Sequence, residues 1–336
     1  MSERLKVIFI TGASSGIGLS TAVYLTSLGY QVVGTSRNPQ KLTTDLLKTR
    51  YRREHTKYKF ANKSKTRVKA VKSLIPEQIE LNLTEIIERI KFYPLILTER
   101  RSIEMAVHSA WEEFDGQNGG IDVLINNAGS GYYGGIEELS MDLIKDQFDI
   151  NYFGQIRVLK EMLPLMRPVG GQIINIASLA GILAIPFQPQ YSATKAAVLR
   201  MTESLRNELK SFNIKVSAVL PGDINTSFNT ESIRLHDQNK NYKSIDIDEM
   251  LEALPVLKDS PYYKDNLRVW REVMLSLITA PCPLEVAKKI AKAIDARRPK
   301  SRYYVGSALE IFLMKYIIRI FPHDLAVKLM GKFFGL

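Results

Sequence analysis

The sequence predicts an α/β fold in which a doubly wound parallel sheet carries helices on both faces. Three observations predict it. Short apolar runs rich in β-branched residues recur along the chain, as buried parallel strands require, and helical patterns separate them. A glycine-rich turn follows the first of these runs directly. The chain has 336 residues, 45% of them hydrophobic, which is enough to bury a large core in one domain.

The first predicted unit is a strand, a turn, a helix and a second strand. The strand spans 5–10, the helix 19–28 and the second strand 31–36, and the turn between them contains Gly12, Gly16 and Gly18. Such glycines allow a tight turn and close approach to a pyrophosphate, while the helix N-terminus offers unpaired N–H groups. A tight turn that binds nothing is the alternative, but the βαβ context favours a Rossmann-like dinucleotide site.

The end of the second strand predicts which dinucleotide binds. An acidic side chain there would accept a hydrogen bond from the ribose 2′-hydroxyl of NAD. This chain has Thr35, Ser36 and Arg37 instead. A guanidinium suits a 2′-phosphate, because it donates two hydrogen bonds to it. We therefore expect NADP(H) as the cofactor; the alternative is that Arg37 is a solvated loop residue.

The positive charge of the chain is concentrated in one segment. The formal net charge is +11, and residues 48–72 contain eleven Lys or Arg and one Glu. We interpret 50–91 as an insertion, a mobile basic loop followed by a short helix or irregular arm. Four explanations stay open: a solvated loop without a partner, binding to anionic lipid, attraction of the anionic cofactor, and nucleic-acid binding. The last is disfavoured, because no RNA-binding motif is present.

Helices and strands alternate through the rest of the sheet region. We expect helices at 101–114, 141–166 and 190–211, and strands at 121–126, 172–177 and 214–220. Gly12, Asn127, Ser178 and Pro221 each lie at or just after the end of a predicted strand. In doubly wound sheets, ligands bind beyond the carboxyl ends of the strands. The four positions therefore predict a single site.

Three side chains indicate proton transfer at an oxygen atom. Tyr191 and Lys195 are four residues apart, so they share one face of a helix, and Ser178 precedes them by thirteen residues. A neighbouring ammonium favours phenolate, so we expect Lys195 to lower the pKa of Tyr191. Ser178 can hold a carbonyl or hydroxyl oxygen in line with the phenol. The group predicts a site that moves a proton on or off an alcohol oxygen.

Six motifs in order give the chain a family resemblance. They are TGASSGIG at 11–18, NNAG at 126–129, Asn151 within FDINYFG, Ser178, YSATK at 191–195 and PG at 221–222. The chain resembles the short-chain dehydrogenase/reductase family over residues 4–47 and about 93–306. The segments around YYGGIEEL and RYYVGSALE resemble the 17β-hydroxysteroid dehydrogenase-like branch, with retinol dehydrogenases nearby.

The resemblance implies roles for individual residues. Tyr191 would be the acid/base, Ser178 would orient the substrate oxygen, Lys195 would bind the nicotinamide ribose, and Asn151 would hold a water in a proton relay. The residues implied to contact the cofactor are Gly12, Ser14, Ser15, Gly16, Ile17, Gly18, Arg37, Asn127, Ala128, Gly129, Tyr191, Lys195, Pro221, Gly222, Ile224 and Thr226. One departure is Ile96, which stands where family members usually carry an Asp near the adenine.

The C-terminal third predicts the substrate side. Residues 223–281 lack strand periodicity, and we interpret them as a lid over a bulky, lipophilic substrate; a lid that does not select substrate is the alternative. Its aromatic residues are Phe228, Tyr242, Tyr262, Tyr263 and Trp270. Segments 131–133 and 182–187 would form other walls. Residues 307–336 extend the domain of 1–306 with two amphipathic helices broken at Pro322, which would pack on the lid, a second subunit or a membrane.

These observations predict an NADP(H)-dependent oxidoreductase that interconverts a lipophilic ketone or aldehyde and an alcohol. The alternatives are a reductase of 3-oxoacyl thioesters and a non-catalytic NADP(H)-binding scaffold. No histidine pairs with another at ligand spacing, so we expect no metal. The single cysteine, Cys282, excludes a disulfide within the chain and is interpreted as a small apolar residue. We expect a cytoplasmic homodimer or homotetramer, with peripheral membrane attachment through 48–72 or the C-terminal helices left open.

Overall fold

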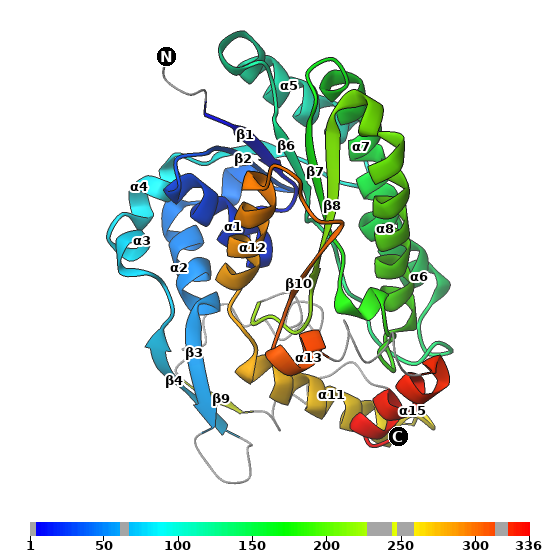
Figure 1. The fold of residues 1–336 in the computed structure, drawn as a ribbon. Coiled ribbons are helices and arrows are strands. Elements are labelled where there is room, and N and C mark those ends of the chain that lie inside the picture. The colour runs from blue at the N-terminus through cyan, green and yellow to red at the C-terminus, as the bar shows by residue number, and fades with distance from the viewer. Residues whose placement is uncertain (1–4, 61–66, 227–243, 247–258, 313–321) are drawn as a thin grey trace.

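The computed structural model describes residues 5–60, 67–226, 244–246, 259–312 and 322–336. A seven-stranded sheet with helices on both faces dominates the molecule (Figure 1). The strands are β1 Val7–Ile10, β2 Gln31–Ser36, β3 Thr56–Phe60, β4 Arg67–Ser73, β5 Lys91–Pro94, β6 Val123–Asn126, β7 Gly171–Ile176, β8 Ile214–Pro221, β9 Ser244–Asp246 and β10 Arg302–Val305. The α-helices are α1 Gly16–Ser27, α2 Thr44–Glu54, α3 Glu77–Leu81, α4 Leu83–Glu88, α5 Arg100–Asn118, α6 Met141–Phe148, α7 Gly154–Met166, α8 Pro189–Glu208, α11 Tyr263–Thr279, α12 Leu284–Asp295, α13 Ala308–Phe312 and α15 His323–Phe333.

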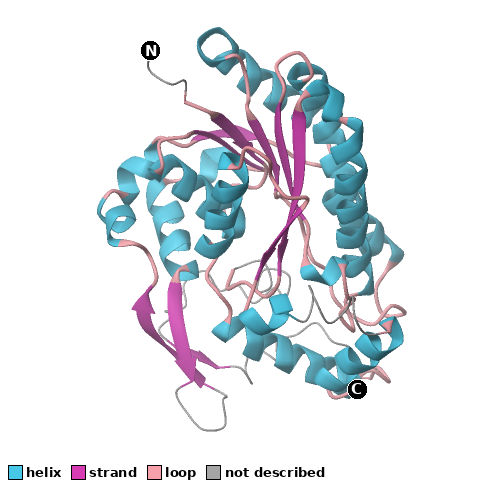
Figure 2. Cartoon of the chain, in the orientation of Figure 1, coloured by secondary structure: helices cyan, strands magenta, loops and turns pink. Residues whose placement is uncertain are grey.

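The large sheet is parallel throughout, in the order β10-β8-β7-β6-β1-β2-β5 (Figure 2). The strand β1 pairs with β2 on one side and with β6 on the other, so the order of the sheet reverses there. The carboxyl ends of the strands on either side of such a reversal diverge and leave a crevice, which is where doubly wound folds bind ligands. The predicted fold class is confirmed.

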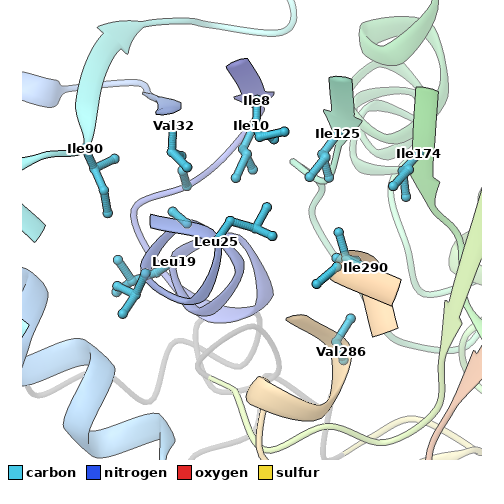
Figure 3. Packing of buried hydrophobic residues seen from close by; sticks show 14 of the residues in the cluster. Ile8, Ile10, Leu19, Leu25, Val32, Ile90, Ile125, Ile174, Val286 and Ile290 are labelled. Carbon is cyan, nitrogen blue, oxygen red and sulfur yellow. The ribbon is translucent and has the colours of Figure 1, made fainter. Parts of the chain in front are cut away.

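Each face of the sheet has its own buried core. On one face, α1 and α12 pack side by side beneath β1, β2, β6 and β7, and Figure 3 shows Leu19 and Leu25 of α1 with Val286 and Ile290 of α12 below the strand residues. On the other face, α5 and α7 contribute a second cluster that includes Ile103, Val107, Val158 and Met162. These apolar cores fix the strand ends, and therefore the functional residues that follow them.

The strands and helices predicted between 101 and 220 are all present, with one difference. The helix predicted for 141–166 is interrupted, because α6 and α7 are joined by a five-residue π-helical turn, Asp149–Phe153. This turn contains Asn151, which is fully buried. Single π-turns within helices often occur at functional sites.

The prediction of a mobile basic loop within 50–91 is wrong for the described residues. The strands β3 and β4 form an antiparallel hairpin, β9 pairs with β4, and the short helices α3 and α4 follow. The segment TKYKF of β3 alternates Lys with larger apolar or aromatic residues, which is the period of a strand. The strand β9 also corrects the view that 223–281 contains no strand.

The C-terminal extension agrees with the prediction where it is described. The helix α15 begins directly after Pro322, and α13 covers 308–312 of the expected preceding helix. Phe334 packs against Val269, Trp270, Val273 and Met274 of α11, so this end of the chain closes against α11 (Figure 1). Within the described residues, no helix is both long enough and apolar enough to cross a bilayer.

Candidate active site

A cavity of about 1440 Å³ lies at the carboxyl ends of the parallel strands. Its volume exceeds what a drug-sized ligand needs, so it can hold a dinucleotide together with a second molecule. Nearly all the predicted site residues line it: Gly12, Ser14, Ser15, Gly16, Ile17, Arg37, Asn127, Ala128, Gly129, Ser178, Tyr191, Lys195, Pro221, Gly222, Ile224 and Thr226. The two predicted residues that do not line the cavity are Gly18 and Asn151, which lie behind its wall.

The glycine-rich turn is held by steric limits and backbone contacts. Gly12 and Gly16 have φ of +67° and +57°, which favour glycine. A Cβ atom on Gly18 would lie 2.1 Å from the Gly12 carbonyl oxygen and 2.6 Å from Nδ2 of Asn127. The third glycine therefore permits close packing of α1 against the turn, which explains why it lies behind the cavity wall.

Two side chains join the turn to the end of β6. Oγ1 of Thr11 accepts hydrogen bonds from the N–H groups of Asn127 and Ala128, at 2.9 and 3.0 Å. The Asn127 amide donates to the carbonyl oxygens of Thr11 and Gly12, at 2.9 and 3.1 Å. Asn127 is thus a brace for the turn, in addition to lining the cavity.

The start of α1 carries an unpredicted carboxylate. Both carboxylate oxygens of Glu54, a buried residue of α2, accept the Gly16 N–H, at 3.0 and 2.9 Å. The Ser15 side chain makes no capping hydrogen bond at this helix start. Glu54 therefore caps α1 from a neighbouring helix and occupies one N–H that we had expected to face a phosphate.

Three cations surround the end of β2 on the cavity wall. Arg37 follows the strand directly, Lys41 lies one turn later, and Arg50 reaches in from α2. Nη1 of Arg50 donates to the Ser14 carbonyl oxygen at 2.9 Å, which fixes the guanidinium beside the glycine-rich turn. Ile96 also lines the cavity, where family members usually carry an Asp. Sequence reasoning identified Arg37 but missed Lys41 and Arg50.

Ser178 and Tyr191 meet at the centre of the cavity. Ser178 lies two residues after the end of β7, and its Oγ donates to the Pro221 carbonyl oxygen at 3.3 Å, so the serine links the ends of β7 and β8. Burial raises the pKa of Tyr191 to about 12, although the hydrogen bond with Ser178 lowers it in part. The expectation of a lowered pKa for Tyr191 is wrong in this structure, because burial has the largest effect on that pKa.

Lys195 lies close to Tyr191 but is held by the backbone. Its Nζ is 5.8 Å from the centre of the Tyr191 ring and donates to the Ile176 carbonyl oxygen at 3.1 Å. Burial lowers the pKa of this ammonium to about 8. A Cβ atom on Gly129 would lie 3.0 Å from Oδ1 of Asn151 and 3.7 Å from Nζ of Lys195. Gly129 therefore separates the lysine from the buried asparagine.

Asn151 is tied to the loop that follows β6. Its Oδ1 accepts the Ser130 N–H at 2.7 Å, and its Nδ2 donates to the Ser130 carbonyl oxygen at 2.9 Å and to Oγ1 of Thr194 at 3.2 Å. The described contacts thus give Asn151 the function of bracing this loop against α8. Its predicted part in a proton relay stays a prediction.

Asp223 also lines the cavity, and it was not among the residues predicted from the sequence. Burial raises its pKa to about 6, a hydrogen bond from Ser276 lowers it in part, and the nearby Glu310 raises it. The Glu310 carboxylate accepts the Asp223 N–H at 3.3 Å. No motif in the sequence marks these residues, because Asp223, Ser276 and Glu310 come from three distant segments.

The end of the cavity beyond Tyr191 has mostly apolar walls. Tyr133 packs edge-on against both Tyr191 and Trp270, with ring centres 5.9 and 5.1 Å apart. The other lining residues here include Tyr132, Leu183, Ile185, Val273, Ala326, Leu329, Met330, Phe333 and Phe334. Segments 131–133 and 182–187 thus contribute walls as expected. Of the predicted lid aromatics, Phe228 and Tyr242 lie outside the described residues, and Trp270 is buried behind Tyr133.

Known proteins similar to this chain agree with this architecture. The family model for short chain dehydrogenases matches residues 6–80 and 65–236. The chain is 29% identical over 330 residues to 3-ketodihydrosphingosine reductase of Bacteroides thetaiotaomicron, covering 94% of this chain and 97% of that relative. It is 29% identical over 307 residues to retinol dehydrogenase 8 of Bos taurus, covering 90% and 82%. A short chain dehydrogenase from Burkholderia cenocepacia J2315, solved in complex with NADP, shares the fold with a TM-score of 0.61 at 19% identity, covering 98% of this chain and 99% of that one.

Proposed function

Because the chain belongs to the short-chain dehydrogenase family, whose members act on alcohol and carbonyl groups, we propose that it reduces a lipophilic ketone or aldehyde with NADPH. The observation that carries the proposal is that one cavity is lined by the cations Arg37, Lys41 and Arg50, by Ser178 and Tyr191, and by a set of apolar side chains. The cations suit a phosphorylated dinucleotide, and the apolar side chains suit an apolar substrate.

The residues at the cationic end fit NADP(H). Gly12, Gly16 and Gly129 line this end of the cavity. Because glycine has no side chain, a cofactor could approach the backbone closely there. No acidic residue follows β2 through Arg37, so a ribose 2′-hydroxyl would lack its usual acceptor. Arg37, Lys41 and Arg50 offer donors for a 2′-phosphate instead. When bound, the cofactor supplies the hydride, and the protein supplies orientation and the proton.

Tyr191 is the proton donor in this proposal. Because its pKa is raised to about 12, the phenol is protonated at neutral pH, which is the form that a carbonyl reduction consumes. Ser178 holds the substrate oxygen beside that phenol. Lys195 would donate to a ribose hydroxyl of the bound cofactor, and its ammonium would stabilise the negative charge that forms on Tyr191 after transfer. A phenol of raised pKa gives up its proton less readily, so the transfer depends on this stabilisation of the phenolate.

The apolar end supports a lipophilic substrate. Leu183, Ile185, Val273, Leu329 and Met330 offer no charged group to a polar ligand. The names of two relatives refer to 3-ketodihydrosphingosine and to retinol, and both compounds carry an oxygen function on a long apolar chain. We propose a substrate of the same kind, with its carbonyl group at Tyr191 and its chain directed toward α11 and α15.

A panel of substrates tests this function. Purified protein would be mixed with NADPH or NADH and with a long-chain 3-ketone, retinal, a short polar ketone or a 3-oxoacyl group on a carrier protein. We expect turnover of the lipophilic carbonyls, with NADPH preferred. Turnover of carrier-bound thioesters alone would identify a 3-oxoacyl reductase instead. Tight NADPH binding without turnover of any substrate would indicate a non-catalytic binding protein.

A further inference from the structure

The exposed side of α15 carries apolar side chains that the rest of the described domain does not fully cover. Leu325, Leu329 and Phe333 recur every four residues along α15, and Leu336 lies just after its end; each of the four is between 38% and 66% exposed. Ala326 of the helix is buried, and Phe334, which follows the helix directly, is buried in the core formed with α11. The apolar surface of α15 therefore extends from its buried side onto its exposed side, whereas a helix packed only on its own domain has a polar exposed side.

Two lysines lie within the exposed apolar face. Lys328 and Lys332 are exposed, and they alternate with Leu325, Leu329 and Phe333 along the same side of the helix. Lysine side chains can extend from an apolar surface to reach a polar layer above it. An apolar helix face with interspersed lysines is the pattern of a helix that lies in the interface of a bilayer with anionic headgroups.

The same helix face adjoins the substrate end of the cavity. Leu329 and Phe333 line the cavity and are also among the most exposed apolar side chains of the described residues. The loop that carries Tyr132 and Tyr133 into the cavity exposes Ile136 as well. Exposed apolar area thus gathers on a helix that lines the cavity, and Figure 1 shows this helix, α15, at the edge of the molecule beside α11.

We propose that the outer face of α15 binds the surface of a phospholipid bilayer and that lipophilic substrate passes from the bilayer into the cavity beside Leu329 and Phe333. The substrate part of this inference rests on the proposed function. A second copy of the chain is a poorer occupant, because an 11-residue helix offers a face of roughly 16 Å by 10 Å, far below the ~800 Å² per partner of a stable protein interface.

Vesicle flotation tests the proposal without any turnover. Full-length protein would be mixed with vesicles of phosphatidylcholine, with or without phosphatidylserine. We expect the protein to bind the anionic vesicles. The double variant Leu325→Glu/Leu336→Glu should lose about tenfold or more in vesicle affinity, because two apolar side chains that would enter the bilayer become charged. Lys328→Gln/Lys332→Gln should weaken binding to the anionic vesicles and leave phosphatidylcholine binding unchanged. Neither pair lines the cavity.

The matched control is Leu28→Glu/Val169→Glu, which places the same charges at two apolar residues of similar exposure on other elements. It should bind vesicles as the unmodified protein does, and thermal melting would verify that all variants are folded. Three results would overturn the proposal: no vesicle binding at all, a loss only in Lys57→Gln/Lys72→Gln of the basic hairpin, or a dimer in sedimentation that Leu325→Glu/Leu336→Glu dissociates. Vesicle binding without ketone turnover would contradict the proposed function and not the docking surface.

Discussion

The two ends of the cavity are built in different ways. The nucleotide end consists of backbone, glycines and short polar contacts from neighbouring strand ends, such as Gly12, Gly18, Thr11 and Asn127. The substrate end consists of large apolar side chains that come from segments far apart in the sequence, such as Tyr133, Leu183, Val273 and Leu329. Steric limits on the backbone therefore determine the shape of the nucleotide end, whereas the apolar area of the side chains determines what the substrate end can bind. We therefore expect substitutions to act abruptly at the nucleotide end and gradually at the substrate end.

The largest effect is expected at the third glycine. Gly18→Ala places a methyl group 2.1 Å from a backbone oxygen, so the turn or α1 must shift. We expect loss of NADPH binding and a fall of about 2–3 kcal/mol in unfolding free energy. The measurements are NADPH fluorescence titration and thermal melting. Gly331→Ala in α15, where the nearest such contact is 4.0 Å away, is the control and should be close to neutral. A Gly18→Ala protein with normal affinity would refute the steric account.

The next effect concerns the buried carboxylate between the two ends. The pKa of Asp223 in the folded protein is about 6, above its ordinary value of 3.8. Ionisation therefore destabilises the fold: the free energy of unfolding falls as the pH rises from about 3.8, and the loss is complete above about pH 6. Asp223→Asn removes this cost and keeps an acceptor for Ser276. We expect a gain of about 3 kcal/mol at pH 8, from a shift of about two pKa units, and a gain below about 1 kcal/mol at pH 4. Thermal melting at both pH values measures it, with exposed Asp259→Asn as the control. A gain that does not depend on pH would exclude ionisation as its cause.

A cationic contact at the nucleotide end should show a smaller and selective effect. Arg50→Ala removes a guanidinium that the Ser14 carbonyl oxygen fixes beside the glycine-rich turn. We expect NADPH affinity to fall about 10- to 100-fold, as for one charged hydrogen-bonding group, while NADH affinity stays constant. Calorimetric titration with both nucleotides measures this. Arg52→Ala on the same helix, whose partner is the exposed Glu80, is the control. Equal losses for NADPH and NADH would rule out 2′-phosphate selection by Arg50.

The smallest effect is expected at the apolar end. Leu329→Ala removes part of one wall of the cavity, so a long-chain ketone should lose a few-fold to about tenfold in kcat/KM. A short ketone that does not reach α15 should be unaffected. Leu325→Ala, one turn away and not in the cavity wall, provides the comparison in steady-state assays. Should both substrates suffer equally, Leu329 would not contact the substrate chain.

The sequence predicted the nucleotide end well because its determinants are local. A glycine-rich turn between a strand and a helix specifies its own backbone geometry, and the parallel strands then bring Asn127, Ser178 and Pro221 to one edge. Arg50 and Asp223 could not be found this way, because helix packing alone brings Arg50 to Ser14, and Ser276 and Glu310 to Asp223.

Two expectations failed for physical reasons. The high lysine content of 48–72 obscured the alternation in TKYKF that forms β3. The pKa of Tyr191 was predicted from the sequence distance to Lys195, whereas the depth of burial, which depends on the whole fold, determines its direction. Patterns of residue type therefore predicted which residues line the cavity but not their electrostatic surroundings.

The central claim is that Tyr191 gives its proton to the substrate oxygen at the junction of the two ends. The most direct measurement is the single-turnover rate of ketone reduction by Tyr191→Phe with NADPH bound at saturation. We expect a loss of about 100- to 10,000-fold with unchanged NADPH affinity, while Tyr133→Phe, which alters the neighbouring ring in the same way, stays near the rate of the unmodified protein. A Tyr191→Phe rate within a few-fold of the unmodified protein would contradict the claim.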